Sequence, residues 1–154
     1  MTTLVTRARL LSTVLRTADI RRIRRISARF GAREFADVLP ALDHLDLRRL
    51  ASALFANEAL EDTIGTLESE SLARLMLAAH PSDLERALEA LVDSEESRSN
   101  SVLLALPRKA RYLALEHVES SVRQALVKRL PRRARPKTED KSLLTVLRLR
   151  RLFA

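Results

Sequence analysis

The sequence contains no cysteine among its 154 residues, and it has only two glycines and five prolines. Without cysteine the chain has no disulfide scaffold, no thiolate metal site and no cysteine nucleophile. The scarcity of glycine and proline argues against disorder and against a turn-rich β architecture. Aromatic residues make up 3% of the chain, so platforms for stacking single-stranded bases are not expected. These scarcities favour a helical protein.

Long apolar runs are also missing, although 46% of the residues are hydrophobic. No run approaches the roughly 18 residues that a membrane span needs. Arg7, Arg9 and Arg16 interrupt the early apolar residues, so we expect no secretory signal. The composition therefore predicts a cytoplasmic protein, and a chain of this length suits one domain.

The residues that are abundant, Leu, Ala and Arg, all favour helix, and the sequence predicts an all-α fold. Thr3 is placed to cap a first helix that runs to about Thr17. Asp19 is placed to cap a second helix that ends at Phe30, because Gly31 suits the position just after a helix.

From residue 36 onward, residues that stop helices recur with a period near 25. Pro81, Pro107 and Pro131 are 26 and 24 residues apart, and Asn57 lies 24 residues before Pro81. Short apolar segments open at about residues 38, 63, 87 and 112, and each is followed by an acidic or serine-rich joint that can cap a second helix. Four helix pairs of this kind are typical of an α-solenoid, since no single pair buries its own apolar face. An irregular helical bundle is the alternative.

Three of these units resemble the N-terminal intracellular domain of MgtE-type magnesium transporters. They are DVLPALDHLDLRRLASAL (37–54), DTIGTLESESLARLMLAAHP (62–81) and RYLALEHVESSVRQALVKRLP (111–131). The resemblance implies a right-handed superhelix over about residues 36–131, of the type shared with the flagellar rotor protein FliG. We therefore divide the chain into basic N-terminal helices (1–35), the superhelix domain (36–131), and a basic linker with a C-terminal helix (132–154).

The same resemblance bears on function. In the transporter family this domain precedes paired nucleotide-binding-like domains and a membrane channel, and it senses magnesium through acidic residues. This sequence shows neither the paired domains nor membrane spans, so we do not expect transport. A magnesium-responsive regulatory role remains one alternative, with a weakly indicated Mg²⁺ at the acidic middle segment as the only cofactor considered.

The net charge of +8 is distributed unevenly along the chain. Residues 1–35 carry nine arginines and two acidic residues, and residues 108–154 carry fourteen basic and four acidic residues. Between them, residues 36–107 carry five arginines and fourteen acidic residues. The sequence leaves two possibilities open: the basic ends fold back onto the acidic middle, or they reach outward to a partner.

Motifs of catalysis are missing from the sequence. The three histidines, His44, His80 and His117, are far apart and lack the spacing of zinc ligands. The two glycines are isolated, so there is no phosphate-binding loop. The paired carboxylates lie at predicted helix joints, where capping explains them. We therefore predict that the protein is not an enzyme and has no catalytic residue and no metal ligand set.

Clusters of arginine are the candidate contact sites, because a guanidinium binds carboxylates and phosphates through two parallel hydrogen bonds. The residues that we select are Arg21, Arg22, Arg24, Arg25, Arg132, Arg133 and Arg135. The sequence favours a non-catalytic helical-repeat module that binds an acidic protein surface. Nucleic-acid binding through the phosphate backbone is the main alternative. Peripheral membrane contact by a basic amphipathic helix at 143–153 and a homo-oligomer are further possibilities.

Overall fold

The computed structural model describes residues 3–136 of the chain. Within this range all regular structure is helical, with nine α-helices and three short 3₁₀ turns. The all-α fold predicted from the sequence is therefore confirmed. The predicted C-terminal helix at 143–153 lies outside the described residues.

The elements follow one another with short connections. In chain order they are α1 (Leu4–Thr17), α2 (Ile20–Phe30), η1 (Ala32–Phe35), η2 (Leu39–Ala41), α3 (His44–Leu54), α4 (Asn57–Thr66), α5 (Ser69–Ala78), α6 (Pro81–Val92), α7 (Glu96–Ala105), α8 (Arg108–His117), α9 (Ser120–Arg129) and η3 (Arg132–Ala134).

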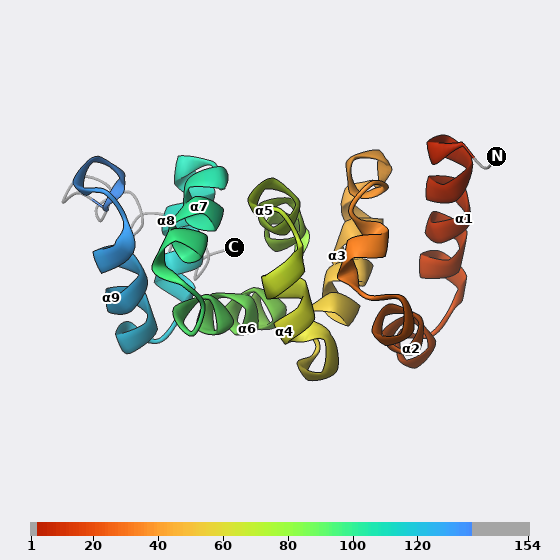
Figure 1. Cartoon of the computed structure of the whole chain (residues 1–154), viewed down its shortest axis with the longest axis horizontal. Helices are drawn as coiled ribbons and strands as arrows, with labels where there is room; N and C mark the ends of the chain where they lie inside the picture. Colours follow the sequence, from red (N-terminus) through yellow and green to blue (C-terminus); the bar gives the residue numbers. More distant parts are fainter. Residues whose placement is uncertain (1–2, 137–154) are drawn as a thin grey trace, which may run out of the picture.

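Helices two places apart in the chain pack side by side (Figure 1). The odd-numbered helices α1, α3, α5, α7 and α9 form one row, in which each contacts the next. The even-numbered helices α2, α4, α6 and α8 form a second row in the same way. This two-row stacking is compatible with the predicted solenoid, because each helix pair buries its apolar face on the neighbouring pairs. The right-handed sense of the superhelix stays a prediction.

The residues that we took as helix stops also start the next helix. Asn57 and Pro81 are the first residues of α4 and α6, and Pro107 is the N-cap residue of α8. We expected these helices to begin at the apolar segments at residues 63, 87 and 112. They begin about five residues earlier. Proline has no N–H to contribute to a preceding turn, but its fixed φ angle suits the first turn of a new helix.

The first predicted pair departs from the others. Its opening segment forms only the 3₁₀ turn η2, and Pro40 lies in the middle of that turn. The carboxylate of Asp43 then caps α3 by accepting a hydrogen bond from the N–H of Asp46 at 2.9 Å. Proline followed so closely by a capping residue leaves no room for a full α-helix before α3.

Both N-terminal caps are confirmed. The hydroxyl of Thr3 accepts a hydrogen bond from the N–H of Thr6 at 3.2 Å and starts α1. The carboxylate of Asp19 accepts one from the N–H of Arg22 at 2.8 Å and starts α2. Each cap satisfies one of the N–H groups that a helix start leaves without an intrahelical partner.

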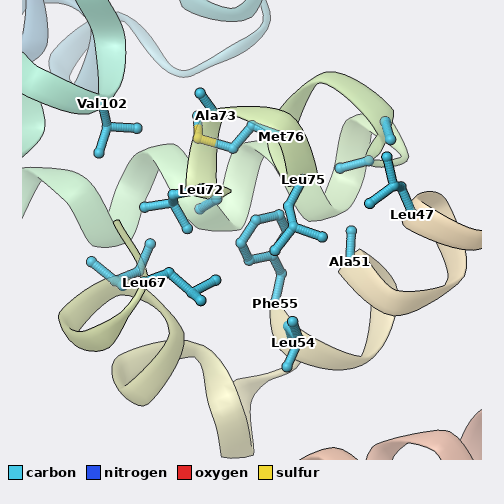
Figure 2. Close-up of a cluster of buried hydrophobic side chains, with 14 of the residues drawn as sticks. Leu47, Ala51, Leu54, Phe55, Leu67, Leu72, Ala73, Leu75, Met76 and Val102 are labelled. Carbon is cyan, nitrogen blue, oxygen red and sulfur yellow. The ribbon is translucent and has the colours of Figure 1, made fainter. Parts of the chain in front are cut away.

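One continuous apolar core runs through the stack, from Ala8 in α1 to Ala134 in η3. Its central part surrounds the ring of Phe55, which is fully buried between α3 and α5 with Leu72 and Leu75 beside it (Figure 2). Ile23 of α2 belongs to the same core. The basic N-terminal helices therefore fold together with the repeat region.

Gly31 joins α2 to η1 with a backbone conformation that other residues avoid. Its φ is +78° and its ψ is 161°. An alanine Cβ built there would also lie 3.4 Å from Asp62 Oδ2. We therefore expect Gly31→Ala to lower the free energy of unfolding by about 1–3 kcal/mol, measured by urea denaturation.

The control for Gly31 is Gly65, the other glycine, which lies inside α4. A Cβ added at Gly65 meets nothing within 4 Å. Because alanine favours helix more than glycine does, Gly65→Ala should be neutral or raise stability by about 0.5–1 kcal/mol. Equal effects of the two substitutions would contradict the role assigned to the backbone of Gly31.

Candidate interaction surface

Helix α2 presents its arginines on the side opposite to its buried residues. Ile23 and Ser27 are buried and face the core, whereas Arg21, Arg22, Arg24 and Arg25 are exposed. At 3.6 residues per turn, these four arginines cover an arc of about 160° around the helix. We call this set of four residues the α2 arginine face.

Within residues 3–136, no side chain of the α2 arginine face forms an ion pair or a side-chain hydrogen bond. One exposed apolar side chain, that of Ile20, flanks the face and is 38% exposed. A run of free guanidiniums bordered by an apolar side chain resembles the composition of interface centres, where arginine is enriched.

The second predicted cluster does not join the first. Arg132 and Arg133 are exposed on η3, which follows α9 at the far end of the stack from α2 (Figure 1). Arg135 lies differently, because its Nε donates to the carbonyl of Leu130 and its Nη2 to the carbonyl of Lys128, both at 3.0 Å. Arg135 therefore caps the end of α9.

The basic helix α1 folds back onto acidic residues. Arg16 binds both Asp43 and Asp46, with Nη2–Oδ2 at 2.5 Å and Nε–Oδ1 at 3.2 Å. The hydroxyl of Ser12 donates to the buried carboxylate of Asp46 at 2.7 Å. The Asp46 hydrogen bond and charge raise the pKa of Arg16. The pKa of Asp43 is lowered by the backbone N–H of Asp46 and also by the charge of Arg16.

Another group of arginines reaches the carboxyl ends of helices. The guanidinium of Arg98 in α7 donates to the carbonyls of Ile64 and Leu67 at the end of α4. That of Arg129 in α9 donates to the carbonyls of Leu91 and Val92, the latter at 2.7 Å, at the end of α6. Such carbonyls have no intrahelical partner, and the helix dipole favours a cation beside them.

The same device recurs along the stack. Arg48 caps α5 through Ala78, Arg49 caps α1 through Leu15, and Arg111 caps α7 through Leu103 and Leu106. Sequence reasoning missed these caps. The available signal was an arginine that interrupts an apolar helix face, as Arg111 does beside the buried Tyr112 and before the buried Ala114.

Burial lowers the pKa of both Arg98 and Arg111. Their guanidiniums are used within the fold, at the ends of α4 and α7. Together with the ion pairs of Arg16, they show that part of the positive charge of the chain is used within the fold. The α2 arginine face is the larger of the two exposed arginine groups predicted from the sequence, since Arg132 and Arg133 are the other within residues 3–136.

Several acidic residues of the middle segment stand at helix starts. Asp43, Glu68 and Glu95 are the N-cap residues of α3, α5 and α7. Among residues 3–136, no group of three or more His, Asp or Glu side chains gathers in a way that could hold a metal ion. His80 accepts a hydrogen bond from the N–H of Ser82 through Nδ1 at 3.3 Å, as the N-cap of α6.

Comparison of the chain with models of protein families, with curated proteins and with solved structures finds no match. The described part of the chain contains no helix long and apolar enough to cross a membrane.

Proposed function

We propose that the protein is a non-catalytic helical-repeat module that binds an acidic protein surface through the α2 arginine face. The observation that carries this proposal is the contrast between arginines of one chain. Arg16, Arg98, Arg111, Arg129 and Arg135 all bind carboxylates or helix ends within the fold. The four arginines of α2 point away from the core and have no such partner in residues 3–136.

Four like charges on one short helix repel one another, and an acidic partner would relieve that repulsion. Guanidiniums also bind carboxylates with defined geometry, which gives specificity in addition to attraction. The exposed Ile20 at the edge of the face adds apolar contact. These features support a protein partner that combines acidic and apolar side chains.

Nucleic acid is the second candidate, because the same arginines suit phosphates. Nucleic-acid binding would be recognised by its dependence on salt, because the affinity for an arbitrary duplex would fall steeply between 50 and 200 mM salt. A magnesium-responsive role and a cytoplasmic location stay predictions of the sequence, as does membership of the MgtE-type domain family.

Charge reversal on α2 tests the proposal. The full chain, immobilised, is used to capture proteins from its native cytosol after nuclease treatment, in parallel with R21E/R22E/R25E. Glutamate favours helix and suits a first turn, so α2 should persist. We expect capture to fall by about tenfold, because three exposed charge pairs at about 0.2–1 kcal/mol each are lost and 1.4 kcal/mol is tenfold.

The matched control is R9E/R74E/K109E, which changes the net charge by the same amount at exposed positions of α1, α5 and α8. It should leave capture nearly unchanged. Equal capture by all three forms would refute a role for α2. Capture that disappears with nuclease alone would assign the arginine face to nucleic acid instead.

A further inference from the structure

A second positively charged feature lies beside the α2 arginine face. A pocket of about 390 Å³ lies between α2, α3 and the start of α6. Four arginines from three helices line it: Arg24 of α2, Arg48 and Arg49 of α3, and Arg86 of α6. The hydroxyl-bearing residues Ser52 and Ser82 also line it, together with His80. We call this pocket the arginine pocket.

The arginines of the pocket keep donors for a ligand. A guanidinium has five N–H donors, and the bonds formed by Arg48 and Arg49 use one N–H each, to the carbonyls of Ala78 and Leu15. These two bonds also fix the guanidiniums in place. Arg24 makes no side-chain hydrogen bond or ion pair with any residue of 3–136. The site is thus partly pre-organised, with two anchored donors and one free donor.

Among residues 3–136, one acidic residue lines the pocket. Asp83 is 6% exposed, and its Oδ1 lies 3.6 Å from Nη2 of Arg86. One carboxylate against four guanidiniums leaves about three positive charges in a recess. A cleft lined by charges of one sign focuses the field and concentrates ions of opposite charge. The pocket therefore has an excess of positive charge and of hydrogen-bond donors.

We propose that the arginine pocket binds a phosphomonoester group. A phosphomonoester carries close to two negative charges at neutral pH and three strong acceptor oxygens, which matches several convergent guanidiniums better than the single charge of a backbone phosphodiester does. Its oxygens can accept bidentate hydrogen bonds from arginine. The recess also suits a phosphate that projects from its carrier, whereas a nucleic-acid backbone lies along a surface.

The neighbouring α2 arginine face points to the carrier. A phosphorylated side chain within an acidic segment would place its phosphate in the pocket and its carboxylates on Arg21, Arg22 and Arg25. The identity of the carrier rests on the proposed function, whereas the phosphate site rests on the pocket alone. An experiment can therefore refute the carrier and the phosphate site separately.

Calorimetric titration of the full chain tests the phosphate site with defined probes. The probes are a peptide with one phosphoserine flanked by glutamates, the same peptide without phosphate, inorganic phosphate, and a 12-base-pair DNA duplex. We expect the phosphopeptide to bind about tenfold more tightly than its unphosphorylated form, because a charge-assisted hydrogen bond contributes about 1.5–3 kcal/mol.

Two substitutions avoid the arginines that cap helices. Arg86→Gln should weaken phosphopeptide binding by about tenfold and leave the unphosphorylated peptide nearly unaffected. Arg24→Gln should weaken the phosphopeptide more than the unphosphorylated peptide, because Arg24 lines the pocket and also belongs to the α2 arginine face. Arg21→Gln is the matched control on α2, since Arg21 does not line the pocket, and should weaken both peptides alike. Asp83→Asn should tighten phosphopeptide binding, because it removes the one repelling carboxylate.

The outcomes separate the sources of the phosphate. Binding of inorganic phosphate with the same dependence on Arg24 and Arg86 would support the site with a free phosphate as its ligand. Equal affinity for the two peptides, or insensitivity to both substitutions, would overturn the phosphate site while leaving the α2 arginine face in place. Duplex binding that is tighter and depends on Arg24 and Arg86 would overturn it in favour of a phosphodiester backbone.

Discussion

Replacing Phe55 by alanine should lower the free energy of unfolding by about 3–5 kcal/mol, the range for a large aromatic side chain removed from a packed core. The ring of Phe55 is fully buried where α3 ends, and Leu54, Leu72 and Leu75 lie around it (Figure 2). Phe55 also accounts for one of only five aromatic residues in the chain.

The size of the effect follows from the stacked architecture. The cavity would open between α3 and α5, and α5 in turn packs on α7. The lost contacts of the ring add to the energy of an unfilled cavity, because helices held by neighbours on both sides cannot close together fully. Thermal denaturation should show a decrease in Tm of about 10 °C or more for a chain of this size.

Phe30 is the matched control, because it is the same residue type in an exposed place. Its side chain is 57% exposed at the end of α2, and its ring lies 5.9 Å from the guanidinium carbon of Arg29. Phe30→Ala should change stability by about 0.5 kcal/mol or less. A Phe55→Ala effect no larger than that of Phe30→Ala would mean that this cluster does not hold α3 against α5.

The helix boundaries were largely predictable because they depend on local chemistry. The side-chain oxygens of Thr3 and Asp19 each accept a hydrogen bond from the backbone N–H three residues later in the chain, and so cap their helices. Gly31 ends α2 because it adopts a positive φ. Pro81 and Pro107 mark joints for the same local reason. What the pattern did not distinguish is a stop from a start, since proline serves at both sides of a joint.

The candidate site was predictable only in part. The density of arginine on α2 was visible in the sequence, and the structure leaves those residues exposed. Arg135 stands in an equally dense run, yet it bonds to the carbonyl of Leu130. The sequence pattern did not indicate the arginine pocket, because Arg48, Arg49 and Arg86 belong to the segment with the most acidic residues.

The arginine caps were unpredictable for a related reason. Arg98 reaches Ile64, and Arg129 reaches Val92, across 34 and 37 residues. Which carbonyl an arginine meets depends on how non-adjacent helices stack, and no local rule encodes that. The net charge of +8 is therefore a poor guide to the surface, since part of it is used to hold helix ends together.

Arg111→Met should lower the free energy of unfolding by about 2–3 kcal/mol. The guanidinium of Arg111 is buried and donates to the carbonyl of Leu103 at 2.9 Å, to that of Leu106 at 3.3 Å and to that of Ala134 at 3.4 Å. Methionine keeps the apolar stem but leaves these carbonyls without a donor, and an unsatisfied buried acceptor costs about 1–3 kcal/mol.

A second effect of this substitution acts in the opposite direction. Burial lowers the pKa of Arg111, so the folded state carries a desolvation penalty that methionine would remove. We expect the loss of hydrogen bonds to be the larger effect. Three carbonyl groups lose their shared donor, whereas the substitution removes the desolvation penalty of a single guanidinium. Arg111→Lys should be intermediate, since an ammonium group lacks the planar fork that reaches separate acceptors.

Lys109→Met provides the control on the same helix, because Lys109 is exposed on α8. It removes an equal charge and introduces the same side chain, and we expect a change of about 0.5 kcal/mol or less. Urea denaturation of the three variants decides between the two effects at Arg111. Equal midpoints for Arg111→Met and Lys109→Met would mean that water satisfies the carbonyls of α7 and that the arginine caps do not hold the stack together. A low midpoint for Arg111→Met, with Arg111→Lys between it and the parent chain, would establish the caps as part of the energy that joins one helix pair to the next.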